Sequence, residues 1–122
     1  MTRRILVTGS RTWTDADVIL AALREHAAGA TDVVVVHGGA AGADRLADQI
    51  AREHGVRVER HPADWARHGR AAGFLRNQKM VKLGADVCLA FIHNASRGAT
   101  ACADTAQAAG IPTYRYETGE KP

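Results

Sequence analysis

The sequence predicts an α/β domain of three layers, with a five-stranded parallel sheet in the order 3-2-1-4-5. Strand-like and helix-like segments alternate along the 122 residues, which implies right-handed crossovers and helices on both faces of the sheet. The most apolar strands, Val33–His37 and Asp86–Phe91, belong inside the sheet. Val56–Arg60 alternates apolar and charged residues, as an edge strand does. We expect one domain over 1–117 and a flexible tail at 118–122.

The first half of the domain contains two strands and two helices before the edge strand. A short apolar run predicts the first strand at Arg4–Thr8. A threonine and an aspartate three residues apart form a capping-box variant, which starts a helix over about 14–28. The second helix, about Ala43–His54, has the clearest 3.6-residue period, and Gly55 is its natural stop.

The second half begins with a long connection. The segment 61–73 has no clear period and is long for a loop in a small domain, so it is predicted to be a functional lid. A helix over Phe74–Leu83 should end at Gly84, and a last helix over Ala99–Ala109 should lead into a final strand at Pro112–Tyr116.

Composition limits the kinds of partner. No apolar run approaches the ~20 residues of a membrane span, so we expect a cytoplasmic protein with no membrane partner. The net charge of +3 is modest and fits either an anionic ligand or a weak contact with nucleic acid, without deciding between them. Cys88 and Cys102 lie in apolar settings and are expected to be reduced and buried.

Three loops rich in glycine, serine and arginine meet where the strand order reverses. They are Gly9–Arg11, Gly38–Asp44 and Ile92–Gly98, and ligands of open α/β sheets bind at such a switch point. Glycine allows close approach of a ligand, and backbone N–H groups at a helix start attract anions. The site is therefore predicted to bind a phosphate-bearing small molecule. Its candidate ligand-binding residues are Gly9, Ser10, Arg11, Gly38, Gly39, Gly42, Asp44, Trp65, Arg76, Asn77, Ser96, Arg97 and Gly98.

Each candidate also has a purely structural interpretation. The glycines suit tight turns, Ser96 suits an N-cap, and Asp44 suits the positive end of a helix dipole. Trp65 could stack on a base or pack the long loop onto the body. Arg76 could face the cleft or the solvent.

No complete catalytic motif is present. The glycine pattern is neither the dinucleotide fingerprint nor a P-loop, and no histidine or cysteine cluster has zinc spacing, so no metal is expected. Asp44 and Asp64 are the candidate carboxylates for acid–base catalysis.

Six short motifs occur in a fixed order: Thr8-Gly9-Ser10-Arg11, His37-Gly38 with Gly42-Ala43-Asp44, Pro62-Ala63-Asp64-Trp65, Ala72-Gly73 with Arg76-Asn77, Ser96-Arg97-Gly98, and Ala109-Gly110-Ile111-Pro112. This set resembles the YspA-type branch of the SLOG superfamily, which is related to the Smf/DprA and LOG proteins. The resemblance covers nearly the whole chain. It implies a Rossmann-like domain that binds a nucleotide or a nucleotide derivative.

LOG enzymes hydrolyse nucleoside monophosphates and carry P-G-G-x-G-T-x-x-E, in which the glutamate is catalytic. In this chain Gly98 matches the last glycine, but Ala99 replaces the threonine and Cys102 replaces the glutamate. The resemblance therefore does not transfer LOG activity directly.

Three functions stay open. A nucleotide sensor is favoured first, and a hydrolase of an N-glycosidic or phosphate bond second. DNA binding of the Smf/DprA type is favoured least, because aromatic residues that could stack on bases are few. A homodimer is a further expectation, since C₂ dimers are the commonest homo-oligomers.

Overall fold

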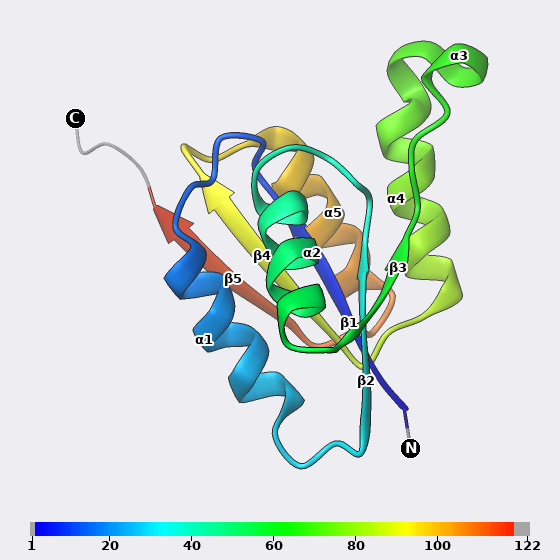
Figure 1. The fold of residues 1–122 in the computed structure, drawn as a ribbon. Helices are drawn as coiled ribbons and strands as arrows, with labels where there is room; N and C mark the ends of the chain where they lie inside the picture. Colours follow the sequence, from blue (N-terminus) through cyan, green and yellow to red (C-terminus); the bar gives the residue numbers. More distant parts are fainter. Residues whose placement is uncertain (1, 119–122) are drawn as a thin grey trace.

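Five parallel strands form one sheet in the order β3-β2-β1-β4-β5 (Figure 1), which confirms the predicted fold class and strand order. The computed structural model describes residues 2–118. Of the predicted tail, Thr118 ends the last strand, and 119–122 lie outside the described residues.

The elements lie close to the predicted ones. The strands are β1 (Thr2–Gly9), β2 (Asp32–His37), β3 (Arg57–Arg60), β4 (Val87–His93) and β5 (Thr113–Thr118). The helices are α1 (Ala16–Ala27), α2 (Ala43–Glu53), α3 (Trp65–His68), α4 (Ala72–Leu83) and α5 (Arg97–Ala108), with the 3₁₀ turn η1 at Gly69–Ala71.

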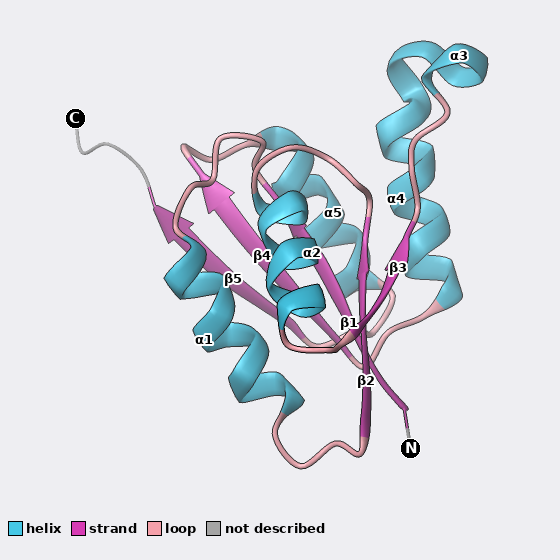
Figure 2. Cartoon of the chain, in the orientation of Figure 1, coloured by secondary structure: helices cyan, strands magenta, loops and turns pink. Residues whose placement is uncertain are grey.

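The helices cover the two faces of the sheet, giving three layers (Figure 2). Successive strand residues point to opposite faces. Ile5 therefore packs with Ile19 of α1 on one face, and Leu6 packs with Met80 of α4 on the other. Both faces of the central strands are buried, as a doubly covered parallel sheet requires.

Two local expectations are wrong. The capping residue of α1 is Asp15, whose side chain accepts a hydrogen bond from Val18 N, so the helix starts later than the predicted box. The segment 61–73 is not an irregular loop, because α3, η1 and the first turn of α4 occupy most of it. Short helical turns of this length have no room for a recognisable period.

Cys88 and Cys102 are both buried and form no disulfide, as predicted. Within residues 2–118, no helix is both long and apolar enough to cross a bilayer.

Candidate functional site

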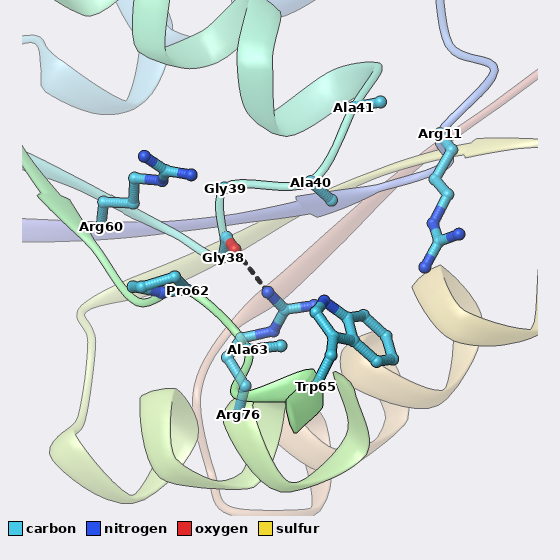
Figure 3. A pocket seen from close by; sticks show the side chains of 10 residues that line it. All are labelled: Arg11, Gly38, Gly39, Ala40, Ala41, Arg60, Pro62, Ala63, Trp65 and Arg76. Carbon is cyan, nitrogen blue, oxygen red and sulfur yellow. Dashed lines mark hydrogen bonds between the residues drawn. The ribbon is translucent and has the colours of Figure 1, made fainter. Parts of the chain in front are cut away.

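A cleft opens at the carboxyl edge of the sheet, where the predicted loops meet. Its main cavity has a volume of about 560 Å³ (Figure 3). A second, inner cavity of about 360 Å³ shares Arg11, Ala40, Trp65 and Arg76 with it. The main cavity is lined by Arg11, Gly38, Gly39, Ala40, Ala41, Arg60, Pro62, Ala63, Trp65 and Arg76. The inner cavity is lined by Thr8, Gly9, Ser10, Arg11, Thr12, Ala40, Asp44, Trp65, Gly73, Arg76, Asn77, Ser96, Gly98 and Ala99.

Among residues 2–118, three arginines and no carboxylate line the main cavity. Arg76 is held in place, because its Nη1 donates to the carbonyl oxygen of Gly38 and its Nε donates to Asn77 Oδ1 at 2.7 Å. Arg11 lies 5.9 Å from the centroid of the Trp65 ring. Within the described part of the chain, the guanidinium groups of Arg11 and Arg60 form no hydrogen bond or ion pair. Two cations therefore face the cavity with their donors unused.

The β2–α2 loop keeps its backbone donors inside the protein. The N–H groups of Gly38 and Ala40 donate to Asp44 Oδ2 at 3.1 and 3.2 Å. The N–H of Gly39 donates to His37 Nδ1 at 2.9 Å. These three N–H groups are thus engaged within the protein, whereas the guanidinium donors of Arg11 and Arg60, which no described residue engages, are free to bind a ligand.

Packing within the fold also explains why this loop contains glycine at positions 38 and 39. A Cβ at Gly38 would lie 2.3 Å from Arg76 Nη1, and a Cβ at Gly39 would lie 2.4 Å from Arg60 Nε. Gly39 also has a φ of +72°, which side chains rarely tolerate. The two glycines make room for the two arginines that line the cavity.

Asp44 is the buried acid of the inner cavity, with 5% of its surface exposed. Its Oδ2 accepts the two loop N–H groups, whereas its Oδ1 is buried with no hydrogen-bond partner among the described residues. Burial raises the pKa of Asp44, and His37 and the N–H of Ala40 oppose that rise. A carboxyl group in this setting holds its proton more tightly than an exposed one and can act as a proton donor.

The two serines predicted to bind a ligand, Ser10 and Ser96, differ in their hydrogen bonds. Ser10 is buried, and its hydroxyl accepts from His93 N at 2.7 Å and lies 3.4 Å from His93 O. Ser96 occupies the N-cap position of α5 without a side-chain cap, and it lines the inner cavity. Ser96 therefore has a hydroxyl that the helix start does not use.

Some predicted residues lie elsewhere. Asp64 is exposed, and its side chain accepts from Arg67 N to cap α3. Neither Arg97 nor Gly42 lines either cavity. Sequence reasoning missed Arg60, the last residue of β3, although the rule that sites form at the carboxyl ends of strands would have indicated it. Among residues 2–118, no group of three or more metal-ligating side chains is placed to hold an ion.

The site can now be compared with known proteins. The YspA, cpYpsA-related SLOG family (YAcAr) matches residues 3–68. The chain belongs to this SLOG family. The motif resemblance is therefore confirmed.

A relative at high identity is the Gene 61 protein of Mycobacterium phage D29. It is 48% identical over 126 residues, which cover 98% of this chain and 99% of that protein. The fold is similar to that of DNA processing protein A from Helicobacter pylori, with a TM-score of 0.64 and 19% identity over 93% of this chain. The chain spans 64% of the length of that structure. At this identity the likeness concerns the fold alone.

Proposed function

We propose that this SLOG domain binds a nucleotide or nucleotide-derived phosphate ligand in the cleft and acts as a cytoplasmic sensor of it. One observation carries the proposal: Arg11, Arg60 and Arg76 line a cavity of about 560 Å³, and no carboxylate of the described part of the chain lines it. Guanidinium groups bind phosphate through paired, charge-assisted hydrogen bonds. Membership of a family linked to nucleotide ligands supports the same choice of ligand.

The residues suggest how such a ligand would lie. Arg11 and Arg60 have unused donors for phosphate oxygens, whereas Arg76 is oriented by Gly38 and Asn77. Trp65 is 51% exposed and lies at the boundary of the two cavities. A base could stack on its ring, with Arg11 on the same ring. Phosphate would then sit in the main cavity.

A thermal-shift screen against nucleotides, cyclic nucleotides, NAD and ADP-ribose tests the proposal. A ligand at 100 times its Kd stabilises the fold by about 2.7 kcal/mol, which is a shift of several degrees. Arg11→Ala should remove the shift with little change in the melting temperature of the free protein, because Arg11 is exposed. Arg24→Ala is the matched control, since Arg24 is exposed in the last turn of α1 and lines neither cavity. A flat screen, or equal effects of the two variants, would contradict the proposal.

Asp44 favours a second candidate function, hydrolysis of an N-glycosidic or phosphate bond. Burial raises the pKa of this carboxyl in the inner cavity, and a general acid needs a proton near neutral pH. Mass spectrometry of a bound nucleotide would detect turnover. Asp44→Asn should then stop turnover while binding persists, and an intact ligand after long incubation would exclude this function.

A third candidate is single-stranded DNA binding. DNA processing protein A from Helicobacter pylori binds single-stranded DNA, and an arginine-lined cleft also attracts a DNA strand. This function has less support, because Trp65 is the one aromatic side chain among the described residues that line the two cavities. Surfaces that bind single strands use several stacking aromatics. Binding of an oligonucleotide that weakens steeply with salt would favour this function.

A further inference from the structure

A third cavity, of about 410 Å³, lies beside the main one. We call it the α2 basin; it is lined by His37, Gly39, Arg45, Asp48, Gln49, Arg52 and Arg60. It shares Gly39 and Arg60 with the main cavity. The two hollows therefore meet at one glycine and one arginine.

The basin is cationic. Arg45, Gln49 and Arg52 are spaced by four and three residues, so they lie on one face of α2. Together with Arg60 they set three guanidinium groups against one carboxylate, that of Asp48. Arg45 is exposed and forms no ion pair within residues 2–118.

The carboxylate in the basin is already engaged through both oxygens. Asp48 Oδ1 accepts from Arg52 Nε at 2.6 Å, and Oδ2 lies 2.6 Å from His37 Nε2. His37 Nδ1 accepts from the N–H of Gly39, so Nε2 carries the hydrogen and donates to Asp48. Both oxygens of Asp48 are thus engaged, and its single charge offsets only part of the charge of the three arginines.

Arg60 connects the basin with the main cavity. The Nε of Arg60 lies only 2.4 Å from the position that a Cβ of Gly39 would take. Its guanidinium group therefore packs against the β2–α2 loop. Among the residues drawn in Figure 3, Arg60 and Arg11 lie at opposite ends of the cavity. A ligand that passes over Gly39 would contact Arg11 and Trp65 at one end and Arg45 at the other.

We infer that the α2 basin is a second anion subsite and that the ligand is a nucleotide derivative with phosphate groups at two separate positions. This inference rests on the proposed function and specifies its ligand. The first phosphate lies with Arg11 and Arg76 in the main cavity, and the second lies between Arg60 and Arg45 in the basin. A nucleoside monophosphate would leave the basin empty.

Isothermal titration calorimetry with matched probes tests this inference. The probes are the four ribonucleoside 5′-monophosphates, the corresponding 3′,5′-bisphosphates and 5′-phosphorylated dinucleotides. At least one probe with two phosphates should bind about tenfold more tightly than its monophosphate, a difference of about 1.4 kcal/mol. Arg45→Gln should remove this advantage and leave the affinity for the monophosphate unchanged. Arg24→Gln, with the same loss of charge on α1, should leave both affinities unchanged.

The outcomes separate this inference from the proposed function. Monophosphate binding that Arg11→Ala removes, with no gain from a second phosphate, would overturn the subsite and leave the proposed function standing. No binding of any probe would overturn both. An equal loss for both ligand classes in Arg45→Gln would assign Arg45 to the general charge of the protein and overturn the subsite. If a 12-nucleotide single strand binds far more tightly than every dinucleotide, the cleft binds a nucleic-acid strand and not a small ligand, which would overturn the inference.

Discussion

The β2–α2 loop and the β4–α5 loop carry similar residue types at the same edge of the sheet, but they differ in how closely they are packed. In the first, Gly38, Gly39 and Ala40 donate their N–H groups to protein acceptors. After the second, in the first turn of α5, no described residue outside that turn lies within 4 Å of the position that a Cβ of Gly98 would take. The side chain of Ser96 does not cap this helix.

A glycine-rich turn from strand to helix therefore has two different structural roles in this protein. At β2–α2 the missing side chains admit Arg60, Arg76 and the backbone of the neighbouring β1–α1 loop. At β4–α5 they leave open space on the wall of the inner cavity. The loop with tight internal contacts fixes the cationic groups, and the open loop leaves room for a ligand.

The largest expected effect comes from Gly42→Ala in the tightly packed loop. Gly42 has a φ of +75°, and a Cβ there would lie 2.3 Å from Ser10 O. Both the strained backbone and the backbone clash should lower the free energy of unfolding, by about 3 kcal/mol or more. Urea denaturation measures this change. A loss below 1 kcal/mol would show that the two loops are not interlocked.

Asp44 links that loop to the helix, so removing its carboxyl group should have the next largest effect. Asp44→Ala leaves the N–H groups of Gly38 and Ala40 without their acceptor, and we expect a loss of about 2 kcal/mol. Asp44→Asn keeps an oxygen that can accept both bonds and should be milder.

Comparing the wild type with Asp44→Asn also tests how stability depends on pH. Burial raises the pKa of Asp44 above its usual value of 3.8 in the folded state, so between these two pKa values Asp44 holds more protons in the folded protein than in the unfolded chain. The stability of the wild type should therefore fall, relative to Asp44→Asn, as the pH rises through the interval between the two pKa values. The limiting slope is about 1.4 kcal/mol per pH unit. A difference that is constant from pH 3.5 to 8 would contradict the raised pKa.

The two serines offer a matched comparison of smaller size. Ser10→Ala removes the acceptor of His93 N and should cost about 1–2 kcal/mol. Ser96→Ala should change stability by less than about 0.5 kcal/mol, because its side chain makes no capping bond. Thermal unfolding of both variants checks the comparison. Equal losses would show that Ser96 is a structural cap after all.

The smallest expected effect has the opposite sign. Gly98 lies in the first turn of α5, and among the described residues beyond its own turn none lies within 4 Å of the position that its Cβ would take. Gly98→Ala should raise stability by about 0.4–1 kcal/mol, since alanine has less freedom to lose on folding. Because the added methyl group would point into space beside the inner cavity, the same variant should weaken ligand binding if the wall at Gly98 is contacted. Calorimetric titration of wild type and variant measures that second effect.

Much of the architecture could be predicted because the signals are local. The valines of β2 and the 3.6-residue period of α2 each depend on neighbours in sequence, and their alternation implies the parallel sheet and its switch point. The short turns of α3 and η1 could not be predicted, since three or four residues hold no period. Arg60 was missed for a different reason: in sequence it is one charge of an alternating edge strand.

The sequence by itself determined the sheet order, the edge of the sheet at which the glycine-rich loops lie, and the glycines, serines and arginines of those loops. Only the tertiary structure decided what each of these residues does. It directs the donors of Gly38 and Gly39 inward, engages Ser10 with His93 and caps α3 with Asp64. It also leaves Asp44 Oδ1 without a hydrogen-bond partner among residues 2–118. The physical reason is that secondary structure follows the periodicity of nearby side chains, whereas the partner of a polar group depends on contacts between segments far apart in the chain.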